Sequence, residues 1–153
     1  MPFSNLKEKL GSISNKARSV DVSFFLDKAI METSEMLTEL VKKQLYSGEK
    51  GDGRMRKYKT AKYEKKKASM NPSAGGVADL FVTGGFYKSI FTEVIGDNIV
   101  TDSNWDGAKD LEFGTDIMDA FTSEIYKLND ENKEIYRIIL VERVKKLMID
   151  AFV

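Results

Sequence analysis

The sequence predicts an α+β domain in which a small antiparallel sheet packs with two principal amphipathic helices and carries a long extended basic loop. Apolar residues recur every three or four positions in two stretches, one early in the chain and one at its end. Between these stretches, two β-branched runs flank Gly96-Asp97, which is typical of a tight hairpin. Residues 48–76 are rich in glycine and lysine and show neither the apolar spacing of a helix nor the alternation of a strand.

The first helix is expected from Ser23 to Tyr46. Ser23 is a suitable N-cap because its hydroxyl can accept an early backbone N–H, and Gly48 is a suitable C-terminal stop. The apolar stripe consists of Leu26, Ala29, Ile30, Met36, Leu37, Leu40, Val41 and Leu45. Such a stripe predicts packing on a sheet or on another helix.

The second helix is expected after Asn129 or Asp130, either of which can cap it, and it runs to the end of the chain. Arg143, Lys145 and Lys146 lie toward its C-terminus, where cations suit the helix dipole. The stripe expected to face the core is made of Ile135, Ile138, Ile139, Val144, Leu147, Met148, Ala151 and Phe152.

Shorter elements fill the middle of the chain. Thr83 could cap a brief helix over residues 84–91, and the hairpin is expected over residues 92–95 and 98–101. Residues 60–67 could form another short helix, residues 105–113 a helix or a turn, and residues 121–128 a strand or extended segment.

The predicted domain organisation has two parts. Residues 1–22 form an N-terminal segment that is either a short helix, with Leu6, Leu10 and Ile13 on one face, or mobile. Residues 23–153 form a single domain, with residues 48–76 as a protruding loop, because 153 residues are enough for one core. The sequence contains no run of about 18 apolar residues, so we expect no membrane span.

Composition excludes several kinds of chemistry. The chain has no Cys and no His, so thiolate and imidazole zinc sites, Ser-His-Asp triads and Cys-His catalysis are all excluded. We therefore expect a protein that is not an enzyme and that binds no cofactor.

Two weak chemical motifs remain. Asp102-Ser-Asn-Trp-Asp-Gly107 matches the first half of a calcium loop, but Phe113 stands where the bidentate Glu should be, so a polar turn is expected and no metal site. An acidic cluster follows, expected to be a solvated face; it consists of Asp106, Asp110, Glu112, Asp116 and Asp119.

Charge is distributed unevenly although the net charge is zero. Residues 47–70 carry nine basic and three acidic side chains, whereas residues 71–153 carry eight basic and fifteen acidic ones. A chain of this kind can attract copies of itself, with the basic segment on the acidic body, or can present a basic patch to a polyanion.

The basic loop is the main candidate for a functional site. Lys and Arg interleaved with Tyr can follow a phosphate backbone, can dock on a neighbouring subunit, or can simply be solvated, and the residues alone leave all three open. The candidate interface or DNA-facing residues are Lys50, Arg54, Arg56, Lys57, Tyr58, Lys59, Lys62, Tyr63, Lys65, Lys66 and Lys67.

Five features of the chain, in order, resemble the head–tail joining and tail-completion proteins of tailed bacteriophages. They are Gln44-Leu-Tyr-Ser-Gly48, Tyr58 and Tyr63 with Lys65, Leu80-Phe-Val-Thr-Gly-Gly-Phe-Tyr-Lys-Ser-Ile90, Leu111-Glu-Phe-Gly-Thr115 and the helix over 131–152. The resemblance spans residues 23–152. Its most specific part is the third segment, with the motif residues Leu80, Thr83, Gly84, Phe86, Ser89 and Ile90.

The resemblance implies a structural virion protein, a subunit of a six- or twelve-fold homo-oligomeric ring in the neck. Portal, connector or tail proteins would be its neighbours, and basic side chains facing the lumen would contact DNA non-specifically. It also implies assembly in the cytoplasm of a bacterial host. The alternative, from the residues themselves, is a small nucleic-acid-binding protein that uses residues 50–67.

Overall fold

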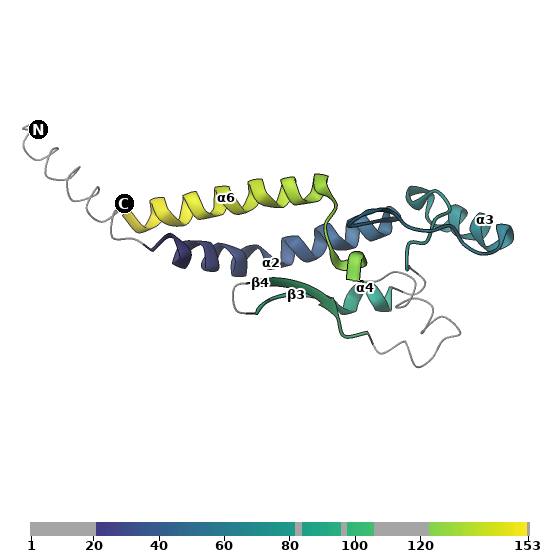
Figure 1. Cartoon of the computed structure of the whole chain (residues 1–153), viewed down its shortest axis with the longest axis horizontal. Helices are drawn as coiled ribbons and strands as arrows, with labels where there is room; N and C mark the ends of the chain where they lie inside the picture. The colour runs from purple at the N-terminus through teal and green to yellow at the C-terminus, as the bar shows by residue number, and fades with distance from the viewer. Residues whose placement is uncertain (1–20, 82–83, 96–97, 106–122, 153) are drawn as a thin grey trace, which may run out of the picture.

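The computed structural model describes residues 21–81, 84–95, 98–105 and 123–152, and these confirm the α+β class. Two long helices, α2 (Val22–Tyr46) and α6 (Asp130–Phe152), lie side by side, and the hairpin β3–β4 lies along the other side of α2 (Figure 1). Helix α3 (Ala61–Met70) lies at the end of the molecule opposite the C-terminus. The described part of the molecule is therefore elongated, with the basic segment at one end.

Helix α2 begins one residue earlier than predicted, and its N-cap is Asp21 rather than Ser23. The Asp21 side chain accepts a hydrogen bond from the Ser23 N–H at 2.9 Å. Asp21 fits because Asp and Ser are about equally good N-caps, and only Asp21 has the extended backbone that an N-cap requires. The predicted C-terminus is confirmed: Ser47 ends the helix, and Gly48 follows with φ +73°.

Helix α6 is capped as predicted, because Asn129 Oδ1 accepts the Asn132 N–H at 2.9 Å. The buried side chain of Gln44 in α2 holds this helix start in place. Its Oε1 accepts the Asn129 N–H at 2.7 Å, and its Nε2 donates to the Lys127 carbonyl at 2.9 Å. The Gln in the Gln44–Gly48 segment therefore connects the two long helices.

The predicted hairpin is confirmed and is longer than expected. Strands β3 (Ile90–Ile95) and β4 (Asn98–Ser103) pair antiparallel from Ile90↔Ser103 to Ile95↔Asn98. A ladder of hydroxyls joins the hairpin to α2, since Thr38 donates to Thr92 at 2.8 Å and Thr92 contacts Thr101 at 3.0 Å. A second, shorter hairpin, β1 (Glu49–Lys50) with β2 (Gly53–Arg54), was not predicted.

The short elements differ from the predictions in detail. The brief helix is α4 (Gly85–Ser89), after Gly84 with φ +80°; Thr83 lies outside the described residues. Residues 121–128 were predicted as a strand or extended segment, but residues 123–126 form the 3-10 helix η3 (Ser123–Tyr126). A 3-10 turn fits here because the chain must place Ile125 and Leu128 in the core just before α6 begins. The predictions for residues 1–20 and 106–122 fall outside the described residues.

The main core gathers residues from α2, the basic segment, α4, β3, η3 and α6. A separate small cluster of Phe25, Ala29 and Leu147 joins the far ends of α2 and α6. The predicted stripes were partly wrong, since Leu26 and Met36 on α2 and Ile135 and Ile138 on α6 are exposed. Helix α6 has apolar residues on more than one side, so its pattern alone did not identify the face that packs. Within the described residues, no helix has the length and apolarity needed to cross a membrane.

Candidate functional site

The basic segment, residues 48–76, is folded rather than a plain extended arm. The β1–β2 hairpin opens it, α3 follows with Thr60 as N-cap, and the 3-10 helix η1 (Pro72–Ala74) closes it. Met55 inserts into the main core, and the backbone of Lys57 bridges to that of Val77. The segment thus returns to the body at both ends and in its middle.

A buried carboxylate, Asp79, anchors the segment to the body. Its side chain is 1% exposed and receives Lys67 Nζ of α3 at 2.8 Å, while the Lys67 side chain is 5% exposed. Lys67 Nζ also donates to the Phe81 carbonyl. A buried pair of this kind is stable only when further hydrogen bonds satisfy both partners.

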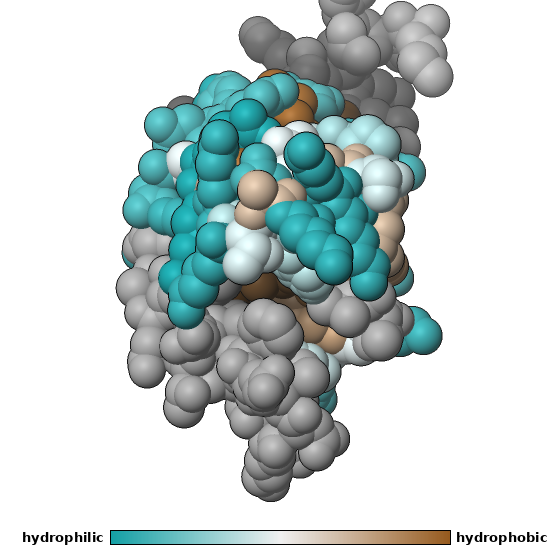
Figure 2. All heavy atoms as spheres, turned by 90° about the vertical axis from the view of Figure 1, so that its right-hand side faces the viewer, coloured by the Kyte–Doolittle hydropathy of each residue, from teal (hydrophilic) through white to brown (hydrophobic). Residues whose placement is uncertain are grey.

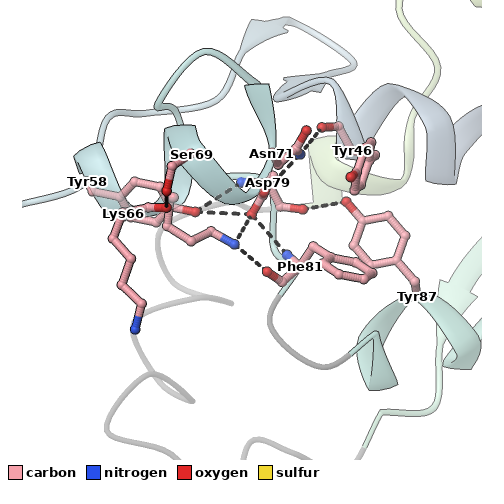
Figure 3. Close-up of polar contacts among 9 residues, drawn as sticks. Tyr46, Tyr58, Lys66, Ser69, Asn71, Asp79, Phe81 and Tyr87 are labelled. Carbon is pink, nitrogen blue, oxygen red and sulfur yellow. Dashed lines mark hydrogen bonds and ion pairs between the residues drawn. The ribbon is translucent and has the colours of Figure 1, made fainter. Parts of the chain in front are cut away.

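Three further donors complete the Asp79 site (Figure 3). Asn71 Nδ2 donates to Asp79 Oδ2 at 2.9 Å and to the Tyr46 carbonyl at 2.7 Å. Tyr58 Oη and the Phe81 N–H each donate to Asp79 Oδ1 at 3.1 Å. The Asp79 carboxylate therefore connects three parts of the basic segment to residues 79–81: Lys67 of α3, Asn71 after α3, and Tyr58 before it.

The electrostatics of the Asp79 site follow from this geometry. Burial raises the pKa of Asp79, but the hydrogen bonds from Lys67, Asn71 and the Phe81 N–H outweigh it and hold the pKa below its usual value. Burial, together with the Asp79 charge, raises the pKa of Tyr58 and of Tyr87. Tyr87 Oη donates to the Asp79 carbonyl, so both hydroxyls stay protonated as donors.

The predicted loop residues separate into inward and outward sets, which corrects the expectation of one outward-facing arm. Lys67 points inward to Asp79, and Tyr58 and Tyr63 pack edge to face with ring centroids 4.9 Å apart. Lys50 pairs with Asp52, and Arg54 donates to the Ala74 carbonyl at 3.1 Å. Arg54 is itself exposed, and the other exposed cations of the segment are Arg56, Lys57, Lys59, Lys62, Lys65 and Lys66.

Helix α3 aligns three of these cations on its outer face. Lys65 and Lys66 follow Lys62 by three and four residues, and all three are exposed. No ion pair joins them to a carboxylate within the described part of the chain. Hydrophilic side chains cover much of the described surface at this end of the molecule (Figure 2). This row, called the α3 lysine row below, is the most concentrated free positive charge in the described residues.

The described motif residues of the phage resemblance have roles in the backbone conformation and packing of this chain. Gly84 needs its glycine because φ is +80°, and a Cβ there would lie 3.4 Å from the Phe81 ring. Phe86 and Ile90 are buried in the main core, and Ser89 Oγ contacts Ser103 Oγ at 2.5 Å. Leu80, half-buried, adopts φ +53° beside the Asp79 site. The segment thus links the anchor of the basic segment to the β3–β4 hairpin.

The weak chemical motifs are only partly described. Asp102 lies in β4, and its Oδ1 accepts the Ser103 N–H at 2.7 Å, so this residue belongs to a strand rather than to a cation-binding loop. The acidic cluster from Asp106 to Asp119 lies outside the described residues. Among the residues that are described, no group of three Asp or Glu side chains is arranged to hold a metal ion.

Sequence reasoning missed Asp79 and Asn71. A signal for Asp79 was present, because it is the one charged residue between Gly76 and Lys88 and interrupts an apolar run. A single acidic side chain in an apolar run is expected to be buried and paired with a basic side chain. No family model, curated protein or solved structure matches this chain.

Proposed function

We propose that this chain is a structural subunit of a homo-oligomeric ring in the head–tail connector of a tailed bacteriophage. The resemblance carried by the segment from Leu80 to Ile90 supports this role, which requires no catalysis. A ring of six or twelve copies would join portal to tail and surround the DNA channel. Assembly would take place in the cytoplasm of a bacterial host, with portal, connector or tail proteins as neighbours.

The observation that carries the proposal is a fixed basic end on an otherwise acidic chain. The Asp79 site holds the basic segment in one place, so the α3 lysine row points outward from a rigid support. Residues 71–153 carry the excess of acidic side chains. A contact between unlike surfaces of neighbouring copies is heterologous, and repetition of such a contact closes a ring.

Exposed apolar residues on α6 are consistent with burial in an assembly. Ile135, Ile138 and Ile149 lie at near-heptad spacing and are all exposed. Glu142, seven residues from both Ile135 and Ile149, lies on the same side of α6 and pairs with Lys145, so a charged pair interrupts the row. Apolar and charged side chains mixed in this way are typical of interfaces between subunits that also exist apart.

The first test changes the charge of the α3 lysine row. The variant Lys62→Glu/Lys65→Glu/Lys66→Glu is expected to remain folded, because all three side chains are exposed, and to lose oligomers in sedimentation velocity. The matched control Lys28→Glu/Lys43→Glu/Lys88→Glu makes the same charge change at exposed lysines outside α3 and α6 and should keep them. Equal loss of oligomers in both variants would contradict the assigned contact.

A second candidate function, nucleic-acid binding, is favoured by the α3 lysine row alone. Tyr58 and Tyr63, the tyrosines expected to stack on bases, pack on each other instead, and Tyr58 donates a hydrogen bond to Asp79. Binding would therefore use phosphates only, without sequence preference. About three phosphate contacts predict that log K falls with log salt at a slope of about −3. Fluorescence anisotropy with duplex DNA tests this, and no binding at low salt would exclude the alternative.

A further inference from the structure

The hairpin β3–β4 forms a sheet of its own. Within the described part of the chain, no third strand pairs with either β3 or β4. A two-stranded sheet leaves a row of N–H and C=O groups on the outer edge of each strand, and such a row is a template for pairing with another extended chain. The outer edge of β4 therefore needs a closer description.

The alternation of the ladder identifies the groups on this edge. The Ser89 carbonyl accepts the Asn104 N–H at 3.3 Å, which makes residues 89 and 104 a hydrogen-bonded pair. In an antiparallel ladder, hydrogen-bonded and non-hydrogen-bonded pairs alternate. Counted along β4 from Asn104, the backbone groups of Val100 point toward β3, whereas those of Ile99 and Thr101 point away from it. Among the described residues, neither Ile99 nor Thr101 has a backbone hydrogen bond outside the hairpin.

Asp102 closes one end of this open stretch. Its Oδ1 accepts the N–H of Ser103, the next residue of β4 whose backbone points outward, at 2.7 Å. Charged side chains on an edge strand are a common way to prevent unwanted pairing. The open stretch therefore consists of Ile99 and Thr101, which together offer two N–H donors and two C=O acceptors.

A cavity of about 700 Å³ lies beside β4. Residues 99–102 line it from β4, and Lys133 and Tyr136 line it from the start of α6. Leu37 of α2 and Leu128 contribute apolar side chains, and both belong to the main core, as Tyr136 does. Figure 1 shows α6 and the hairpin on opposite sides of α2. The volume lies in the range of about 300–1,000 Å³ that is usual for binding sites.

The cavity borders the edge of β4 rather than one face of the hairpin. Side chains of successive strand residues point to opposite faces, so four consecutive residues do not line a space that covers one face alone. No described residue of β3 lines the cavity, so the edge concerned is the one away from β3. The open backbone groups of Ile99 and Thr101 thus meet an apolar space. This edge with its cavity is called the β4 edge site below.

The charged residues of the β4 edge site favour an acidic ligand. Lys127 and Lys133 line it and are exposed, whereas the carboxylate of Asp102 is already bonded to the Ser103 N–H. Lys133 pairs with Asp130 at 3.0 Å, but both side chains are exposed, 58% and 99%. An exposed pair of this kind contributes little to stability, so a carboxylate of a ligand can replace Asp130.

The shape of the site favours a single extended chain over a folded copy of this protein. In every copy, the edge of β4 lies across the cavity from α6, with residues 126–128 beside it. Paired strands must approach to about 4.8 Å. If two such edges approached each other, the α6 helices and residues 126–128 of both copies would meet first. An extended peptide has no such neighbours.

We propose that the β4 edge site binds an extended peptide segment of a partner protein that carries both apolar and acidic side chains. The segment pairs with Ile99 and Thr101 as a third strand. It places an apolar side chain against Leu37 and Tyr136 and a carboxylate beside Lys133. In strand addition of this kind, main-chain hydrogen bonds provide affinity and side-chain pockets provide specificity. The proposal does not depend on the proposed ring function.

Amide hydrogen exchange, measured residue by residue by NMR on the full chain, tests the pairing. The probe is a short synthetic peptide that alternates Val with Thr and ends in a run of Asp. At saturation it should slow exchange at Ile99 and Thr101 by about tenfold or more and leave Val100, which already bonds to β3, unchanged. The same peptide methylated on every backbone nitrogen keeps its side chains but cannot donate, and it should protect neither residue.

Two charge changes test the acidic preference. A probe with Lys in place of Asp should bind much more weakly than the acidic probe. Lys133→Glu should weaken binding of the acidic probe by about fivefold or more. The matched control is Lys145→Glu, which lies on the same helix outside the site and has the same kind of exposed pair, with Glu142. It should leave the affinity nearly unchanged.

Each other outcome overturns the proposal. Slow exchange at Ile99 and Thr101 without a probe, increasing with protein concentration, would show that a second copy covers the edge. Slow exchange without a probe at every concentration would show that the chain covers the edge itself. Absence of binding, binding that protects neither residue, or equal binding of the acidic and basic probes would exclude the assigned ligand.

Discussion

At the scale of single residues, Asp79 determines where the basic segment lies. Its carboxylate accepts hydrogen bonds from Lys67, Asn71, Tyr58 and the Phe81 N–H. Each donor comes from a different place along the chain between residues 58 and 81. Removal of the acceptor therefore releases the whole arrangement, whereas removal of one donor leaves the others in place.

The first prediction follows from this asymmetry. Asp79→Ala leaves Lys67 Nζ buried without a counter-ion and should lower the free energy of unfolding by roughly 3–5 kcal/mol. Lys67→Met should cost distinctly less, because Asp79 keeps Asn71, Tyr58 and the Phe81 N–H as donors. Urea denaturation followed by circular dichroism measures both. A larger loss in Lys67→Met than in Asp79→Ala would contradict the central position of Asp79.

The second prediction concerns acid. The pKa of Asp79 is lowered in the folded protein, so its contribution to stability is complete above the unfolded pKa of about 3.9 and is lost as pH falls through the lower folded pKa. The difference in unfolding free energy between wild type and Asp79→Asn should therefore be largest near pH 6 and smaller at pH 3. Urea titrations at the two pH values measure this difference. A difference in unfolding free energy that is larger at pH 3 than at pH 6 would contradict the lowered pKa of Asp79.

Sequence reasoning was least complete at this scale. It counted Lys67 among outward cations because a lysine at that position looks the same whether it is exposed or buried. The identity of its partner depends on how α3 folds back on residues 77–81, which is a tertiary contact between positions twelve residues apart. The lone acid at position 79 was the only local sign of it.

At the scale of elements, the joint between α2 and the basic segment depends on Gly48. Its φ is +73°, and a Cβ at this position would overlap Val77 Cγ2 and lie 3.2 Å from the Ala74 carbonyl. Ala74 lies at the end of the basic segment, and Val77 follows directly after it. One glycine thus allows the start and the end of the segment to pack together.

The third prediction compares two glycines with similar backbones. Gly48→Ala should lose about 1–3 kcal/mol more than Gly75→Ala, because overpacking adds to the backbone strain that both share. Gly75 has φ +60° and only Arg54 Nη2 near, at 3.4 Å. Thermal unfolding gives the difference, and tryptic digestion should cut the basic segment faster in Gly48→Ala. Equal losses of stability in the two variants would show that the close contact with Val77 and Ala74 does not make glycine necessary at position 48.

Elements with strong periodic signals were predicted well. The two long helices, their C-terminal stop at Gly48 and cap at Asn129, and the β3–β4 hairpin all follow from local patterns. The β1–β2 hairpin was missed because two-residue strands carry no alternation to detect. Residues 123–126, predicted within a strand or extended segment, form a 3-10 helix instead, because the tertiary packing that buries Ile125 leaves no local pattern.

At the scale of the whole molecule, shape and charge act together. The described residues form an elongated body with the basic segment at one end (Figure 1). The α3 lysine row lies on a support fixed by the Asp79 site, and acidic residues dominate the chain from residue 71 onward. The sequence alone provided the charge split, and the folded segment shows which of its cations are free to take part.

The fourth prediction is that assembly depends on salt. If the α3 lysine row contacts acidic side chains of a neighbouring copy, oligomers should weaken as NaCl rises from about 0.05 to 0.5 M, because screening shortens the range of exposed charges. The variant Lys62→Glu/Lys65→Glu/Lys66→Glu should form no oligomers at any of these salt concentrations. Sedimentation velocity at several salt concentrations measures it. Oligomers that strengthen with salt would indicate an apolar contact instead.

Native mass spectrometry of the concentrated protein, alone and in the assembled neck, tests the central claim most directly. The ring proposal predicts species with six or twelve copies of the 17.3 kDa chain. A protein that stays monomeric at every concentration and never enters a complex that contains a portal would contradict it.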